Sequence, residues 1–159
     1  MNVIESRSYA LASAGVVDID APARASGSID IDAPREAVWD ALAHVENWPG
    51  IRGDISDARA TAAPATGVTF TWHAGGLPLV SAFALVDRAH RLTWASTAPG
   101  VSAVAVYDFA ELGPARTRID CEESMDAAAV APGLDDVALA DRIRTWLEGI
   151  RAYAEARSA

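Results

Sequence analysis

The stretch from Ile29 to Pro49, IDIDAPREAVWDALAHVENWP, constrains the fold more than any other part of the chain. Polar and apolar residues alternate from Ser28 to Asp32, as in a half-buried strand. Pro34 suits the first turn of a helix, where its missing N–H costs nothing. The next apolar residues share one helical face: Val38, Ala41, Leu42 and Val45. Pro and Gly residues within 47–53 must end the helix, so the stretch predicts a strand, a short helix and a turn in succession.

After this turn the apolar pattern changes to a period of two residues and keeps it from Ile55 to Met125. Gly75-Gly76, Pro99-Gly100 and Gly113-Pro114 mark turns between the alternating segments. Strands separated only by short turns indicate an antiparallel meander. The chain then closes with an expected helix, about Val137 to Ala156, whose apolar residues recur at helical spacing: Leu139, Ile143, Trp146, Leu147, Ile150, Tyr153 and Ala154.

The N-terminal residues 1–24 carry the weakest pattern. The sequence at 17–25, VDIDAPARA, nearly duplicates that at 29–37, IDIDAPREA, with no third copy. We interpret the pair as two neighbouring extended segments and not as a repeat architecture. We therefore expect one domain over residues 1–159, with 1–24 as an extended segment that forms part of an extra strand.

These elements predict an α+β protein in which a curved antiparallel sheet wraps around the long C-terminal helix, with a short helical segment between strands 1 and 2. That arrangement buries the apolar faces of both the sheet and the helix. The space between a curved sheet and a single helix need not fill completely, and a cavity there is a natural binding site.

Composition excludes several classes of function. The net charge of −9 argues against nucleic acid and anionic membranes as partners, because both require a basic face. No apolar run reaches the length of a membrane span, and Glu5 before the short apolar run 9–17 argues against a signal peptide. The single Cys121 fits a reducing compartment, so we expect a cytoplasmic protein. All 13 basic residues are Arg, which excludes Schiff-base chemistry and a Lys-containing phosphate loop.

The motifs together resemble a known family. The strand–APREAVWDAL–NWP stretch, the Phe70–Trp72 strand, the Arg91–Trp94 strand, the Thr117–Ser124 strand and the terminal helix are similar to the START/Bet v 1-like (SRPBCC) superfamily, in its bacterial polyketide cyclase/dehydrase-like branch. The resemblance covers about residues 17–157 and implies the helix-grip fold and no cofactor. It does not specify an activity, because members range from lipid carriers to aromatic cyclases and chaperone activators.

Two residues are the catalytic candidates. Glu123 shares strand parity with Ile119 and Cys121, so it is expected to face the cavity, where burial would raise its pKa and let it act as an acid or base. Tyr107 also has inward parity, and a phenol in an apolar cavity can donate to a carbonyl. Each also has a structural interpretation: Glu123 as the partner of an Arg at the rim, and Tyr107 as a core aromatic.

The expected ligand-binding residues are mainly aromatic. Arg52 and Asp54 lie in the turn after the first helix, near the expected mouth, although we favour their interpretation as ordinary surface charges. The family often has a second Trp where Ile51 and Arg52 stand, and a bulky polar residue where Ala105 stands. The three His residues lack metal-ligand spacing, and His73 is expected to face solvent, so we expect no metal. The ligand-binding set comprises Trp48, Arg52, Phe70, Trp72, Phe83, Trp94, Phe109, Cys121, Ile143 and Trp146.

Three hypotheses for function stay open. The first is a protein that encloses a small hydrophobic or aromatic molecule and, if it is an enzyme, resembles a cofactor-independent polyketide cyclase or dehydratase that uses Tyr107 and Glu123. The second is a non-catalytic carrier or sensor of a lipophilic molecule. The third is a protein-interaction module with a filled core and an exposed apolar patch. Each is compatible with a monomer or a homodimer.

Overall fold

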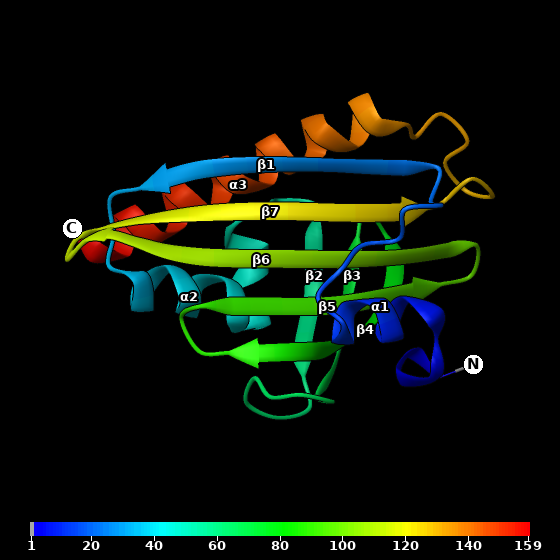
Figure 1. Ribbon diagram of the computed structural model, residues 1–159, viewed down its shortest axis with the longest axis horizontal. Coiled ribbons are helices and arrows are strands. Elements are labelled where there is room, and N and C mark those ends of the chain that lie inside the picture. The colour runs from blue at the N-terminus through cyan, green and yellow to red at the C-terminus, as the bar shows by residue number, and fades with distance from the viewer. Residues whose placement is uncertain (1) are drawn as a thin grey trace.

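A computed structural model describes residues 2–159 and shows one curved antiparallel sheet (Figure 1). The sheet has seven strands in the order β1-β7-β6-β5-β4-β3-β2, so consecutive strands are neighbours from β2 to β7 and β1 closes the far edge. The strands are β1 (Ala23–Ile31), β2 (Ile55–Ala60), β3 (Thr69–Ala74), β4 (Leu77–Asp87), β5 (Arg91–Ala98), β6 (Val101–Gly113) and β7 (Arg116–Asp126). The expected meander is confirmed.

The helices cover both faces of this sheet. In Figure 1, α3 passes behind β1 and β7, and α1 lies in front of β4 and β5. The helix-grip α+β fold is therefore confirmed, with α3 across the inner face. The helical segments are η1 (Val3–Glu5), α1 (Arg7–Ser13), α2 (Arg35–Ala43), η2 (Val45–Gly50) and α3 (Asp136–Ser158).

The helix α3 is held by an N-terminal cap and an apolar stripe. The Asp135 side chain accepts a hydrogen bond from the Ala138 backbone N–H, which satisfies one free donor of the first turn. The missing side chain of Gly27 on β1 lets α3 lie close to the sheet, because a Cβ there would lie 3.0 Å from Ile143. The buried stripe matches the sequence prediction at Leu139, Ile143, Trp146, Leu147, Ile150 and Ala154.

The segment α2–η2 is shaped by its own backbone contacts. Pro34 precedes the first turn of α2, and the predicted apolar face is buried. Trp39, which the sequence did not place on that face, is also buried and packs edge-on against Phe109. The Trp48 indole N–H donates to the Leu42 carbonyl at 2.9 Å, which folds η2 back towards the inner face.

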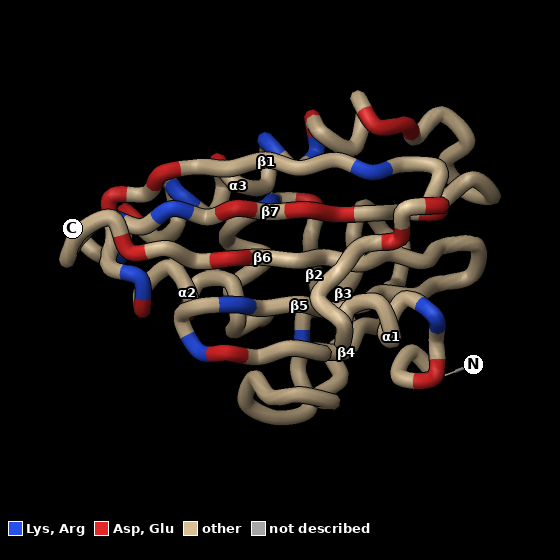
Figure 2. Tube along the Cα trace, viewed as in Figure 1, with Lys and Arg blue, Asp and Glu red and all other residues tan. Residues whose placement is uncertain are grey.

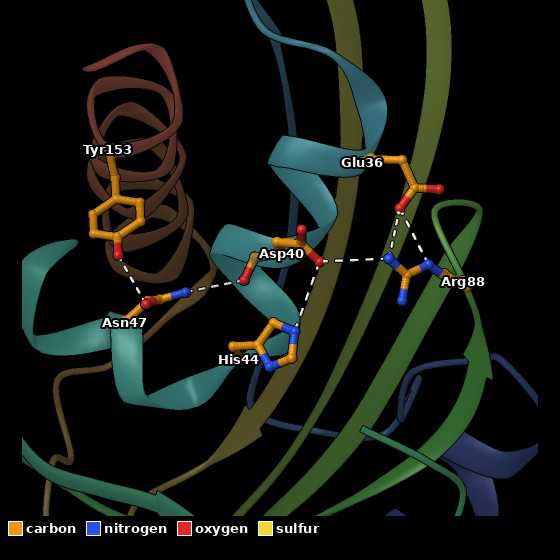
Figure 3. A network of polar contacts seen from close by, with 6 residues as sticks. All are labelled: Glu36, Asp40, His44, Asn47, Arg88 and Tyr153. Atoms are coloured by element: carbon orange, nitrogen blue, oxygen red, sulfur yellow. Dashed lines mark hydrogen bonds and ion pairs between the residues drawn. The ribbon is translucent and has the colours of Figure 1, made fainter. Parts of the chain in front are cut away.

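A polar network fastens this segment to two other elements (Figure 3). Arg88, from the turn between β4 and β5, pairs with Glu36 and approaches Asp40 on α2. The Asn47 amide donates to the Asp40 carbonyl, and its oxygen accepts from the Tyr153 hydroxyl of α3 at 2.8 Å. Exposed ion pairs contribute little stability. The contacts instead fix the position of the α2–η2 segment, and η2 carries Trp48 to the inner face.

The extended conformation expected for residues 1–24 is wrong. The Ser6 side chain accepts from the Tyr9 N–H and starts α1, and β1 begins only at Ala23. The helix packs on the outer face of the sheet, where the Thr93 hydroxyl donates to the Ala12 carbonyl at 2.8 Å. The outward residues of β4–β6 are small and apolar, so they need cover from water. This outer cluster comprises Val3, Ala12, Val17, Ala82, Ala84, Ala95, Val104 and Val106.

Charged residues follow the part of the outer face that α1 leaves uncovered. Figure 2 shows Asp and Glu recurring along β7 and β6, with Arg nearby. Arg118 lies within ion-pair distance of Asp30 and Asp120, so much of this acidity is locally compensated. No helix of residues 2–159 combines the length and apolar character that a membrane crossing requires.

Candidate functional site

The centre of the space between the sheet and α3 is occupied by aromatic rings. Trp48 is 1% exposed, and its ring centroid lies 5.0–5.5 Å from those of four other aromatic residues. These contacts join η2, the strands β3 and β5, and α3, so the aromatic cluster is also a principal part of the core. Its members around Trp48 are Phe70, Trp72, Trp94 and Trp146.

Tyr107 and Glu123 meet beside this cluster. Tyr107 on β6 lies opposite Cys121 on β7, and Glu123 lies two residues further along β7 on the same face. The Tyr107 hydroxyl donates to Glu123 Oε2 at 2.7 Å. The Tyr107 ring stacks on Trp94 with centroids 5.0 Å apart and an interplanar angle of 8°. The inward orientation expected for both candidates is therefore present, and the two side chains form one hydrogen-bonded pair.

Electrostatics distinguish the two groups of this pair. The carboxyl group of Glu123 is surrounded by protein although the residue keeps some exposed surface, and this burial raises its pKa. Hydrogen bonds from Tyr107 and Cys121 and the charge of Arg52 act in the opposite direction. Burial also raises the pKa of Tyr107 well above 10.0. Tyr107 therefore stays a neutral donor, and Glu123 is the member of the pair that can exchange a proton.

Cys121 completes the local polar cluster. Its Sγ lies 3.7 Å from Glu123 Oε2, and burial followed by the neighbouring Glu123 charge raises the thiol pKa well above its ordinary value. A thiol with a raised pKa is a weak donor and not a nucleophile. Cys121 is therefore a small buried residue of the inner face.

One end of the inner face is less covered than the other. We call it the open end and define it by its partly exposed inward residues, Trp72, Ala103, Glu123, Met125 and Leu134. Arg52 lies nearby, since its charge acts on Glu123 and its guanidinium carbon is 5.7 Å from the centroid of the Trp146 ring. Arg52 also pairs with Asp54, so the two rim residues named from the sequence hold each other.

Other predicted binding residues lie deeper. Phe70 and Phe83 pack together with centroids 4.6 Å apart, and both are 1% exposed or less. Phe109 packs against Trp39 of α2, and Ile143 of α3 is buried against β1. The structure therefore places Trp94, Cys121 and Arg52 beside the Tyr107–Glu123 pair. Trp48, Trp72 and Trp146 join it only through the ring cluster around Trp48, and Phe70, Phe83, Phe109 and Ile143 are buried in the surrounding core.

Sequence reasoning missed a second polar pair on the inner face. The hydroxyls of Ser81 on β4 and Ser96 on β5 lie 2.6 Å apart, and the Trp72 indole N–H donates to Ser81 Oγ at 3.0 Å. A signal was present, because Ser81 has the strand parity of Phe83 and Ser96 has that of Trp94. Because serine is polar, the sequence pattern did not indicate that these two positions belong to the inner face.

Other features lie outside the inner face. His73 was expected to face solvent, but the structure shows it partly buried. Its Nδ1 lies 3.5 Å from Asp57 Oδ2. Among residues 2–159 no three His, Cys, Asp or Glu side chains are grouped to hold a metal ion. Two surface hollows lie elsewhere, one on the outer face of β1, β7 and β6 and one where β1 meets the flank of α3.

Solved structures share this architecture. A hypothetical protein from Helicobacter pylori superposes with a TM-score of 0.71 at 17% identity, covering 86% of this chain and 90% of that one. A START superfamily protein from Mycobacterium smegmatis gives 0.66 at 12% identity, with 85% and 96% covered. BexL, a di-domain ARO/CYC from the BE-7585A biosynthetic pathway, gives 0.63 at 20% identity, with 83% of this chain and 46% of BexL covered. At these identities the likeness establishes the fold alone.

The curved sheet, the gripped helix and these neighbours define a START-like helix-grip protein. The family model for polyketide cyclase / dehydrase and lipid transport proteins matches residues 22–155, and the chain belongs to that family. The family resemblance given by the sequence motifs is thereby confirmed. No curated protein matches the sequence.

Proposed function

We propose that this protein binds a small hydrophobic or aromatic molecule bearing a carbonyl group between the sheet and α3, and that this molecule enters at the open end. The observation that carries the proposal is the Tyr107–Glu123 pair. A titratable carboxyl with a raised pKa lies against aromatic side chains, at the end where inward residues are partly exposed. Such convergence of a few polar groups in an apolar setting is typical of ligand sites.

The chemistry that suits this pair is proton transfer beside a carbonyl. Glu123 in its ionised form would take a proton from the carbon next to the carbonyl. The resulting enolate would attack a second carbonyl of the same molecule, and Glu123 would return the proton to the new alkoxide. Tyr107 holds the carboxyl group in place through its hydrogen bond. The sequence of steps needs no external oxidant or reductant, and the shape of the aromatic wall would select the reacting conformation.

Support from relatives is consistent with this proposal. The family includes polyketide cyclases and dehydrases, and the structurally similar BexL is an ARO/CYC of a biosynthetic pathway. The filled aromatic centre implies that an incoming ligand must displace side chains, and the partly exposed Trp72 and Met125 are the ones nearest solvent.

Hydrogen–deuterium exchange of a simple ketone tests the proposal. 1-Tetralone in D2O is followed by NMR with wild type, Glu123→Gln and the matched control Glu122→Gln, whose side chain lies on the outer face. We expect wild type and Glu122→Gln to accelerate exchange at the carbon next to the carbonyl, and Glu123→Gln to lose the acceleration. The catalytic proposal fails if wild type does not exceed buffer, or if Glu123→Gln equals wild type.

A lipophilic carrier is the second candidate. It is favoured by the largely aromatic inner surface and by the lipid transport members named in the family description. It predicts a co-purified apolar molecule in native mass spectrometry of freshly purified protein. It also predicts that the double variant Glu123→Gln/Tyr107→Phe keeps that molecule, whereas wild type fails to accelerate tetralone exchange.

A further inference from the structure

The second polar group on the inner face has one more donor than it uses. The Trp72 indole, the Ser81 hydroxyl and the Ser96 hydroxyl supply three donor hydrogens, and the described residues join them by two hydrogen bonds. A single serine would suffice to accept the indole N–H. The second serine therefore leaves one hydroxyl hydrogen without an acceptor among residues 2–159.

Burial decides which hydroxyl carries the unused hydrogen. Ser81 is fully buried, so an unpaired donor there would have no access to water or ligand. Ser96 is 4% exposed and lies opposite Ala103, which is partly exposed at the open end. Either hydroxyl can donate across the serine pair; donation from Trp72 to Ser81 to Ser96 leaves the free hydrogen on the less buried hydroxyl, which is the one nearer the open end.

β6 lies between Ser96 and Glu123, and its inward side chains at this point, those of Ala103 and Ala105, are methyl groups. Ser96 lies opposite Ala103, and Ala103 lies opposite Met125 on β7. One row deeper, Ala105 lies between Trp94 and Glu123. Two strand spacings and a two-residue offset place the Cα atoms of Ser96 and Glu123 about 12 Å apart. With the two side chains projecting in parallel from the same face and a hydrogen bond at each end, roughly 6 Å is left between two ligand oxygens, about the span of one six-membered ring.

We propose that Ser96 is a second anchor of the ligand site and that the ligand is an aromatic or cyclic molecule with oxygen acceptors on opposite sides of a ring. One oxygen accepts from the Ser96 hydroxyl, the other accepts from the Glu123 carboxyl in its protonated form, and the ring lies across β6 over Ala103. The inference rests on the proposed function, since it names the ligand class of that same site. Ser96 acts here as a specificity-determining residue, with Ser81 and Trp72 as the residues that position its hydroxyl.

Three probes of matched shape test this ligand class. 1,4-Diacetylbenzene has two carbonyl oxygens, 4-ethylacetophenone has one and 1,4-diethylbenzene has none. Binding to the full chain is measured by calorimetry and by tryptophan fluorescence, for wild type, Ser96→Ala and the control Ser102→Ala, whose parity on β6 places it on the outer face. We expect wild type to bind the two-carbonyl probe most tightly. Ser96→Ala should weaken that probe about threefold to tenfold and leave 1,4-diethylbenzene within about twofold.

The outcomes separate this inference from the proposal beneath it. Equal affinity of wild type for all three probes, or equal weakening of all three by Ser96→Ala, overturns the two-anchor inference and leaves ligand binding intact. If Ser102→Ala weakens the two-carbonyl probe as much as Ser96→Ala does, the role of Ser96 is also refuted. Failure of folded wild type to bind even 1,4-diethylbenzene at its solubility limit overturns the proposed function itself. The wild-type comparison needs no variant, so a folding defect in Ser96→Ala leaves it decisive.

Discussion

The inner face of the sheet has two ends that differ in chemistry although the same strands build both. At the end near α2, Phe109, Ile119 and Leu92 are buried, and the one inward hydroxyl, that of Thr117, donates to the Ala33 carbonyl at 2.8 Å. At the open end several inward residues are partly exposed, among them Glu123 and Met125, while Ser81 and Ser96 are buried. There the pKa of Glu123 is raised by burial, and the serine pair has one more donor hydrogen than its hydrogen bonds use.

This difference shows how one sheet can separate stability from binding. Polar groups that are fully paired within the protein have nothing to offer a ligand, whereas partly paired groups carry a cost in the empty protein and gain from a ligand. Moving along β6 by two residues, from Tyr107 to Ala105, replaces an inward aromatic ring by a methyl group.

The largest effect is expected from removing the ring of Phe109. Phe109→Ala deletes a buried side chain packed on Trp39 and leaves a cavity, which should cost about 3–5 kcal/mol of the free energy of unfolding. Met125→Ala, on the same inner face at the open end, should cost less than about 2 kcal/mol because Met125 is partly exposed. Urea unfolding followed by tryptophan fluorescence measures both. Equal losses would remove the distinction between the two ends.

Glu123→Gln should change the pH dependence of stability. The pKa of Glu123 is raised in the folded protein above its ordinary 4.5, so its stabilising contribution is present below pH 4.5 and is lost as the pH rises through the folded pKa. The amide cannot ionise. The variant should therefore gain stability relative to wild type as the pH rises, with the difference smallest below 4.5. Thermal unfolding across pH 4–8 checks this, and a constant difference at every pH contradicts it.

Tyr107→Phe should lower the free energy of unfolding while keeping the aromatic ring in place. The variant keeps the ring stacked on Trp94 and loses the hydrogen bond to Glu123, at a cost of about 1–2 kcal/mol near neutral pH. Because that hydrogen bond lowers the pKa of Glu123, the pKa should rise further in the variant. Carbon-13 NMR titration of the glutamate side chains measures the shift. An unchanged or lower pKa would show that the hydrogen bond does not favour the ionised form.

The smallest effect is expected at Arg52. Its positive charge lowers the pKa of Glu123 from the rim, so Arg52→Gln should raise that pKa slightly and cost only a few tenths of a kcal/mol. Arg59→Gln on the exposed surface of β2 is the matched control and should leave the Glu123 titration unchanged. The same NMR titration, run at low ionic strength, reads both variants. If both shift the pKa alike, the rim position of Arg52 has no special influence.

Much of the fold follows from local signals. The Pro34 helix start, the period-two segments and the apolar stripe of α3 each report on their own neighbourhood, and each element lies where its pattern predicts. The N-terminal segment was misread because its similarity to 29–37 suggested a strand. The Ser6 cap and the small residues that pack on the outer face of β5 are weak signals in the sequence. The face that they contact forms only when the sheet assembles.

The candidate site was predictable only in part. Strand parity directed Tyr107 and Glu123 to one face, since alternation along a strand is a local property. Parity could not show that their oxygens lie 2.7 Å apart or that Phe109 belongs to the opposite end. The pairing of Ser81 with Ser96 was missed for the same reason, because it depends on the register between β4 and β5.

The sequence by itself determined the family, the order of the elements and the inward direction of Glu123 and Tyr107, because these depend on periodicity and on motifs read along the chain. Only the tertiary structure decided which polar groups meet, which rings close the core and which end of the grip stays open. The physical reason is that strand register, sheet curvature and the docking of α3 bring together residues far apart in sequence. Burial, which raises the pKa of Glu123 and leaves Ser96 with an unused donor, exists only after that assembly.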